Sequence, residues 1–171
     1  MIVSLIGLPG CGKTTVGRLL GKRLGLPSVD ADQRIEERLG CSIRDYFERE
    51  GEAAFRAVET MVLDELTQGA DCVLSTGGGA VLAADNRRHL RTRSHVVYLH
   101  AQPWLLARRL RDDLQRPLLQ GGALPERLQE LARVREPLYR ETAHMVVDTS
   151  SATPMLLVQR IAMQLEMSGL T

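Results

Sequence analysis

The sequence predicts an α/β fold of three layers, in which a five-stranded parallel sheet has helices on both faces and a phosphate-binding loop follows the first strand. Five short apolar runs alternate with segments of helical periodicity along the whole chain. Such alternation is typical of strands joined by helical crossovers, which makes neighbouring strands parallel. The length of 171 residues is that of one domain, so we expect a single domain over residues 1–171.

The first apolar run, residues 2–6, leads directly into GLPGCGKT at residues 7–14. This matches the pattern G-x-x-x-x-G-K-[ST], in which backbone N–H groups and a helix N-terminus surround phosphate groups. In that pattern Lys13 reaches the β- and γ-phosphates, and the Thr14 hydroxyl reaches a Mg²⁺ ion. The alternative is a Gly-Pro turn that matches by chance, but a strand before the loop and a helix after it disfavour that reading.

A helix is predicted over residues 14–24, where Gly17 would permit close packing and Gly25 would end the helix. Residues 26–30 form the second predicted strand, and a helix follows over residues 33–39. Asp30 and Asp32 therefore stand at the carboxyl end of a strand, where open α/β sheets bind ligands. Two carboxylates beside a phosphate loop suit a metal ion and a hydroxyl group. The alternative for Asp32 is that it caps the helix that follows.

Ser42 is predicted to cap a helix over residues 43–48, and a longer amphipathic helix covers residues 52–66. On this second helix Arg56 and Glu59 have i,i+3 spacing, which by itself indicates a solvated ion pair. The third strand, residues 72–75, runs into the glycines at positions 77–79. Three glycines make a flexible loop by default, but near a phosphate site they also let a ligand contact the backbone.

The remaining elements are predicted from the same signals: helices over residues 86–91, 103–111, 126–139 and 154–165, and strands over residues 95–99 and 145–148. Periodicity fades between residues 112 and 125, where the chain is polar and rich in Gly and Pro. This segment is either a mobile lid, with Arg116 in its basic and apolar RPLL patch, or an ordinary surface loop.

The composition limits the binding partners and the cellular compartment that we expect for this protein. The formal net charge is +1, which gives no reason to expect nucleic acid or a membrane as a partner. The apolar runs are too short to span a bilayer and no leader segment is recognisable, so we expect a cytoplasmic protein, and a monomer. Cys11, Cys41 and Cys72 lack metal spacing and are expected to be reduced thiols.

Several further motifs resemble those of the shikimate kinases, in the nucleoside monophosphate kinase branch of the P-loop proteins. In chain order they are GLPGCGKTTVGRLL, VDADQRIE, GEAAFRAVE, STGGGAV, RPLL and REPLYRETA. Together they cover essentially the whole chain. The phosphate loop alone specifies only phosphate binding, whereas the ordered set of the others is specific to the family.

The resemblance implies ATP-dependent phosphorylation of shikimate to shikimate 3-phosphate, with release of ADP, in the chorismate route to the aromatic amino acids. It implies ATP-binding residues Gly10, Cys11, Gly12, Lys13, Thr14, Thr15, Arg109, Arg116 and Pro154. It implies shikimate-binding residues Asp32, Arg56, Gly77, Gly78, Gly79 and Arg135. Lys13, Asp32 and Arg116 would be catalytic, and Thr14 and Asp30 would hold Mg²⁺, Asp30 through water.

Four points stay open at this level. By the resemblance, Arg109 and Pro154 lie on either side of the adenine ring of ATP. A small register shift would put Arg108 or Arg111 in the place of Arg109. Asp32 beside cations should stay ionised, so it would orient the hydroxyl and accept its proton late, rather than act as a strong base. Cys11 is either a reactive thiol at a helix N-terminus or a small apolar filler. The rival functions are another small-molecule kinase, such as a gluconate or nucleoside monophosphate kinase, and a nucleotide-binding module without catalysis.

Overall fold

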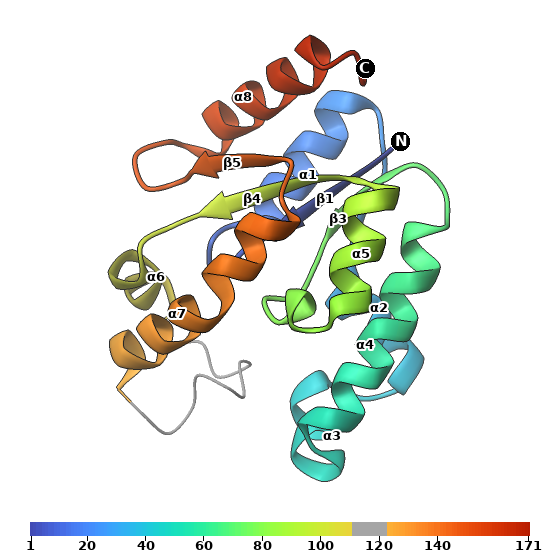
Figure 1. Ribbon diagram of the computed structural model, residues 1–171, viewed down its shortest axis with the longest axis vertical. Coiled ribbons are helices and arrows are strands. Elements are labelled where there is room, and N and C mark those ends of the chain that lie inside the picture. Colours follow the sequence, from blue (N-terminus) through green and yellow to red (C-terminus); the bar gives the residue numbers. More distant parts are fainter. Residues whose placement is uncertain (111–122) are drawn as a thin grey trace.

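A five-stranded sheet lies at the centre of the computed structural model, which describes residues 1–110 and 123–171 (Figure 1). The strands are β1 (Ile2–Ile6), β2 (Ser28–Asp30), β3 (Cys72–Ser75), β4 (His95–His100) and β5 (Met145–Asp148). They pair in the order β2-β3-β1-β4-β5, and every pairing is parallel. The predicted fold class is confirmed, and β1 occupies the middle of the sheet, so the loop that follows it emerges at the centre of the carboxyl edge.

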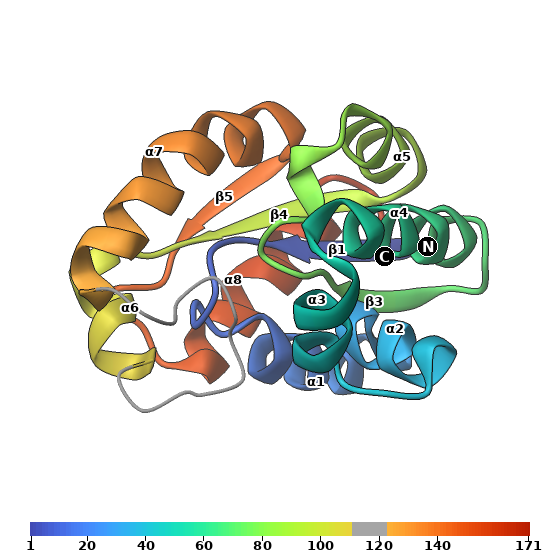
Figure 2. The ribbon, with the colours of Figure 1, turned by 90° about the horizontal axis from the view of Figure 1, so that it is seen from below.

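Helices cover both faces of the sheet (Figure 2). On one face lie α1 (Lys13–Leu24) and α8 (Pro154–Met167), and on the other lie α4 (Glu52–Thr67), α5 (Ala84–Arg93) and α7 (Leu124–Thr142). Two shorter helices, α2 (Ala31–Leu39) and α3 (Ile43–Glu50), pack against α4, while α6 (Pro103–Leu110) packs against α7. A single 3-10 turn, η1 (Ala80–Leu82), follows the triple glycine.

The elements agree with the sequence prediction in number and order over the described residues, and differ from it at their ends. Helix α7 begins at Leu124, two residues earlier than expected, with Pro125 in its first turn, a position that suits proline because its missing N–H has no partner there. The last two residues of the segment expected as a lid are therefore helical. Residues 112–122 of that segment, including Arg116, lie outside the described residues.

Helix α1 approaches β3 closely, and Gly17 makes this approach possible. A Cβ atom at Gly17 would lie 2.6 Å from Ser75 Oγ. The Ser75 hydroxyl is buried and donates a hydrogen bond of 2.9 Å to the Lys13 carbonyl. Close packing at Gly17, as predicted, thus ties the first turn of α1 to the end of β3.

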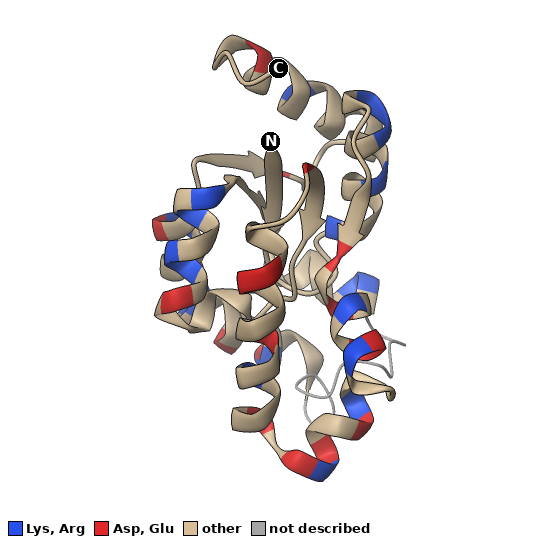
Figure 3. Cartoon of the chain, turned by 90° about the vertical axis from the view of Figure 1, so that its right-hand side faces the viewer, with Lys and Arg blue, Asp and Glu red and all other residues tan. Residues whose placement is uncertain are grey.

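Charges of both signs are interspersed over the helices seen in Figure 3, in keeping with the formal net charge of +1. Among the described helices, none combines the length and apolar character needed to cross a membrane.

The contact between Gly17 and Ser75 generates a stability prediction. Alanine normally stabilises a helix interior by about 1 kcal/mol relative to glycine. Gly17→Ala should instead destabilise the protein by about 1–3 kcal/mol, because the new methyl group overpacks the space beside Ser75. In a Ser75→Ala background the same change should become neutral or stabilising. Urea unfolding of the four proteins in a double-mutant cycle measures the difference. An equal cost of Gly17→Ala in both backgrounds would contradict the assigned contact.

Candidate active site

The loop between β1 and α1 is folded as an anion-binding turn. Gly10 and Gly12 have φ values of 82° and 101°, in the left-handed region where a side chain is strained. The Cys11 N–H donates to the Leu8 carbonyl at 3.2 Å, which closes the loop, and Gly12 occupies the N-cap position of α1. The loop therefore lies directly over the N-terminus of α1, whose unpaired N–H groups and dipole favour a phosphate group.

The Lys13 side chain lies across this loop and is only 9% exposed. Its ammonium group donates to the carbonyl oxygens of Gly7 and Leu8 at 2.7 and 3.1 Å. The loop itself thus holds one buried positive charge beside the helix N-terminus. A flexible lysine in this place can exchange backbone carbonyls for phosphate oxygens without any change in the backbone.

Cys11 points into the protein. Its side chain is 2% exposed, and Sγ lies 3.7 Å from Lys13 Nζ. Of the two interpretations left open by the sequence, the structure favours the small apolar filler over the accessible thiol. Cys72 is also buried, which raises the pKa of its thiol, whereas Cys41 is partly exposed.

Asp30 joins the phosphate loop to α2. One carboxylate oxygen, Oδ2, accepts a hydrogen bond of 3.1 Å from the Thr14 hydroxyl. The other, Oδ1, accepts from the N–H groups of Asp32 and Gln33 at 2.9 and 3.3 Å. The N-cap of α2 is therefore Asp30, and the interpretation of Asp32 as that cap is wrong, because the helix begins at Ala31 rather than after Asp32.

The three glycines after β3, Gly77–Gly79, form a corner that three charged side chains approach. A Cβ atom at Gly77 would lie 2.8 Å from Asp32 Oδ1, and one at Gly78 would lie 3.3 Å from Arg135 Nη1. A Cβ atom at Gly79 would overlap the guanidinium group of Arg56. A side chain at Gly77 or Gly79 would displace the charged group that lies there, and one at Gly78 would crowd Pro9 and Arg135.

This glycine corner also touches the phosphate loop. A Cβ atom at Gly78 would lie 2.9 Å from Cδ of Pro9, which is part of the loop. A group bound at the corner and a phosphate bound at the loop would therefore be neighbours.

Glu59 belongs to the same cluster, although its i,i+3 spacing from Arg56 indicated only a solvated ion pair. It is 1% exposed, and its Oε1 accepts a hydrogen bond of 2.8 Å from Arg56 Nη1. Burial raises the pKa of the Glu59 carboxyl group; Arg56 and Arg135 oppose that rise and Asp32 adds to it. The sequence did hold a signal, since Glu59 stands between Phe55 and Val62 on the buried face of α4.

Arg135 is buried on α7, with 3% of its surface exposed, and it completes the cluster opposite α4. The Arg109 side chain extends from α6 to the Gly10 carbonyl at 3.3 Å, which places Arg109 beside the phosphate loop. Pro154 stands in the first turn of α8, and Arg108 and Thr15 are exposed. Arg111, like Arg116, lies outside the described residues, so the choice of arginine at the adenine stays a prediction.

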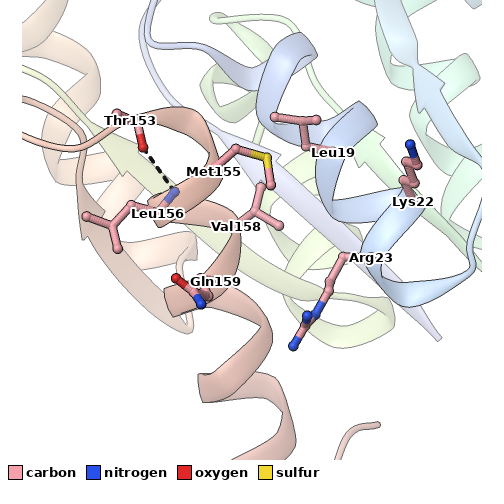
Figure 4. Close-up of a pocket in the computed structure, with 8 residues that line it drawn as sticks. All are labelled: Leu19, Lys22, Arg23, Thr153, Met155, Leu156, Val158 and Gln159. Carbon is pink, nitrogen blue, oxygen red and sulfur yellow. Dashed lines mark hydrogen bonds between the residues drawn. The ribbon is translucent and has the colours of Figure 1, made fainter.

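A separate groove of about 550 Å³ lies between α1 and α8 (Figure 4). It is lined by Leu19, Lys22, Arg23, Thr153, Met155, Leu156, Val158 and Gln159. None of these is a site residue that the sequence predicts. The charged cluster described above lies instead at the carboxyl edge of the sheet, beside the phosphate loop.

A parallel sheet with a phosphate loop after its central strand, adjoining two arginines and a carboxylate, defines a P-loop phosphotransferase for a small anionic acceptor. The comparisons with known proteins agree. The family described as "Shikimate kinase" matches residues 9–166. A shikimate kinase from Paracidovorax citrulli is 54% identical, with 98% of this chain and 93% of that protein covered. One from Ralstonia nicotianae is 49% identical over 98% of this chain and 88% of that protein.

Among solved structures, shikimate kinase from Acinetobacter baumannii in complex with shikimate superposes with a TM-score of 0.96 at 42% identity, covering 99% of this chain and 95% of that one. The chain belongs to the shikimate kinase family.

The buried carboxyl group of Glu59 predicts a pH dependence. Its pKa is higher in the folded than in the unfolded state, so the folded protein takes up a proton at higher pH than the unfolded chain. The stability of wild type relative to Glu59→Gln should therefore rise as the pH falls from neutral toward the ordinary glutamate pKa of 4.5. Urea unfolding across this range measures the difference.

Glu65, on the same helix, provides the matched control. Its hydrogen bond with Arg38 lowers the pKa of the Glu65 carboxyl group, so the pH dependence of its contribution to stability has the opposite sign to that of Glu59. The stability of wild type relative to Glu65→Gln should stay level down to about pH 4.5 and fall below it, so the measurements on this pair extend to lower pH. A Glu59→Gln difference that is flat with pH, or that follows Glu65→Gln, would show that burial does not govern Glu59.

Proposed function

We propose that this chain transfers the γ-phosphoryl group of ATP to a ring hydroxyl of shikimate, releasing ADP and shikimate 3-phosphate, in the biosynthesis of chorismate and the aromatic amino acids. The observation that carries the proposal is the glycine corner, where Asp32, Arg56 and Arg135 converge beside the phosphate loop. The relative from Acinetobacter baumannii, which has nearly the same fold, was solved in complex with shikimate. An acceptor site that touches the phosphate loop suits in-line transfer between two bound groups.

The two arginines are suited to the carboxylate of the acceptor. A guanidinium group presents parallel N–H donors that match both oxygens of a carboxylate. Glu59 holds one end of the Arg56 guanidinium through the 2.8 Å hydrogen bond, which fixes its orientation before an acid binds. Burial strengthens this recognition because water competes less with the ion pair.

Asp32 is suited to the hydroxyl that is phosphorylated. Its carboxylate lies against Gly77 at the acceptor side, while the cap of α2 is made by Asp30. It can therefore accept a hydrogen bond from the hydroxyl, orient the oxygen toward the phosphate and take up the proton late in the transfer.

Lys13 is suited to the charge that develops on the phosphates. When it leaves the carbonyl oxygens of Gly7 and Leu8, its ammonium group can contact the oxygen atoms of the β- and γ-phosphates. The stabilisation is greatest in the transition state, where negative charge moves toward the leaving oxygen. Arg116 would act on the same charge, and the segment around it is proposed as a lid; both lie outside the described residues.

The Thr14 hydroxyl and the Asp30 carboxylate fit a Mg²⁺ ion. They are hard oxygen donors 3.1 Å apart at the end of the phosphate loop. Mg²⁺ in kinases is bound through few protein oxygens, with waters and substrate phosphates as the other ligands. When bound, the ion would neutralise phosphate charge. In the described residues no cluster of three or more His, Cys, Asp or Glu side chains forms a metal site.

Two rival functions remain useful as alternatives in the test. A gluconate or nucleoside monophosphate kinase would share the phosphate loop but would not need two arginines around three glycines. A nucleotide-binding module without catalysis would not need Asp32 and Arg56 beside the loop. We further propose that the chain is one kinase domain that works as a cytoplasmic monomer.

Coupled measurement of ADP release tests the assignment. Shikimate, gluconate and each nucleoside monophosphate are offered in turn with Mg-ATP. Shikimate should give turnover at least a hundredfold above the others, because only it presents a carboxylate and ring hydroxyls at the matching spacing. An acceptor that lacks one of these groups leaves its buried partner in the protein unpaired. Equal turnover with another acceptor, or none with shikimate, would refute the proposed function.

Lys13→Ala should lower kcat on the order of a thousandfold while the protein stays folded, because Lys13 acts on charge in the transition state. Lys22→Ala is the control. The chain has only these two lysines, and Lys22 lines the groove between α1 and α8. Steady-state kinetics and thermal unfolding of both variants make the comparison. A Lys13→Ala enzyme with nearly normal turnover would show that this role is wrongly assigned.

Arg56→Lys and Arg135→Lys should each raise KM for shikimate by about tenfold or more and leave KM for ATP nearly unchanged, because lysine keeps the charge and loses the planar pair of donors. Arg133→Lys is the control, since Arg133 is exposed on the same helix as Arg135 and pairs with Glu130. If titration showed ATP binding weakened and shikimate binding intact, the carboxylate would have to bind elsewhere.

A further inference from the structure

The carbonyl groups of the glycine corner are all used by the protein. The Gly77 and Gly79 carbonyl oxygens accept hydrogen bonds of 3.1 Å from the N–H groups of Ala80 and Leu82. These donors belong to the next few residues of the same segment. The Gly78 carbonyl is different, because its donor is the hydroxyl of Tyr139, at 2.5 Å and 61 residues away.

Tyr139 holds this hydroxyl in one place. The side chain is fully buried, and its ring stacks on Tyr98 with 4.9 Å between centroids. Burial raises the pKa of the Tyr139 hydroxyl, so the group keeps its proton and remains a donor at neutral pH. A buried tyrosine with a fixed ring cannot offer its proton to another acceptor without repacking the core.

Tyr139 also lies next to the substrate-binding side chains. It stands one helical turn after Arg135 on α7, so both side chains lie on the same face of the helix. Arg135 approaches Gly78 from one side and Tyr139 binds the carbonyl of the same residue. The two peptide groups that flank Gly78 continue into Gly77 and Gly79, where Asp32 and Arg56 make their close approaches.

We propose that Tyr139 is a positioning residue of the acceptor site: its hydroxyl fixes the plane of the Gly78 peptide and so holds the glycine corner, with the three charged side chains packed on it, in the arrangement that recognises the acid. Tyr139 contacts no substrate atom in this account. It acts through the Gly78 carbonyl and through the Arg135 side chain, with which its hydroxyl also interacts. The proposal rests on the proposed function, since it deepens the description of the same site.

The rival interpretation is that Tyr139 is an ordinary core aromatic whose hydroxyl has merely found a partner. A variant of Tyr98 distinguishes the two interpretations, because the Tyr98 ring stacks on the ring of Tyr139. Tyr98 is equally buried, at 1% exposure, and its hydroxyl interacts with Glu136 on α7, whereas the Gly78 carbonyl is bound by Tyr139. Tyr98→Phe therefore repeats the chemical change and the core packing of Tyr139→Phe without touching the glycine corner.

Steady-state kinetics of wild type, Tyr139→Phe and Tyr98→Phe test the proposal. Tyr139→Phe should raise KM for shikimate on the order of tenfold, because a buried carbonyl loses its donor and the corner relaxes. KM for ATP should stay within about twofold of wild type, since the phosphate loop keeps its own hydrogen bonds. Tyr98→Phe should change neither value. An unchanged KM for shikimate in Tyr139→Phe, an equal rise in both KM values, or the same rise in Tyr98→Phe would overturn the proposal.

Amide hydrogen exchange gives a second readout that needs no substrate. The N–H groups of Ala80 and Leu82 donate to the corner carbonyls, so they should exchange faster in Tyr139→Phe than in wild type, by about tenfold, and not in Tyr98→Phe. Should wild type fail to phosphorylate shikimate, the proposed function would fall and the exchange rates alone would decide the role of Tyr139. Unaltered exchange in Tyr139→Phe would then overturn that role.

Discussion

The absence of side chains at three consecutive positions is the constraint on which the acceptor site depends. Asp32, Arg135 and Arg56 reach the space that Cβ atoms would fill at Gly77, Gly78 and Gly79. These charged groups come from three different helices, α2, α7 and α4, and their side chains meet at the turn that follows β3. Buried charges are costly unless they are paired, and here the pairing of Arg56 with Glu59 offsets part of that cost while it fixes the guanidinium group.

The rest of the fold sets the corner beside the phosphate loop. Strand β1 is central in the sheet, with β3 as its neighbour, so the turns that follow these two strands emerge side by side. Gly17 lets α1 lie close against β3, and Ser75 binds the carbonyl of Lys13 across that contact. The phosphate loop and the glycine corner are thus adjacent parts of one edge of the sheet, which suits the proposed transfer between two bound groups.

The sequence predicted this architecture because strand and helix signals alternate strongly and the phosphate loop has a fixed spacing. It predicted less well wherever the outcome depended on tertiary contacts. Either Asp30 or Asp32 could cap α2, and the choice followed from a helix start that shifted by two residues. Glu59 has the same spacing from Arg56 whether the pair is solvated or buried, so the spacing did not decide; only its place on the apolar face of α4 indicated burial. The reason for the three glycines, close approach by protein side chains, also needed the folded chain.

A crystal structure of the protein with shikimate and ADP tests the central claim most directly. We expect the shikimate carboxylate to lie between the guanidinium groups of Arg56 and Arg135. The ring should pack on Gly77–Gly79, with a hydroxyl within hydrogen-bond distance of Asp32. A carboxylate bound at the phosphate loop, or a ring bound in the groove between α1 and α8, would contradict the account.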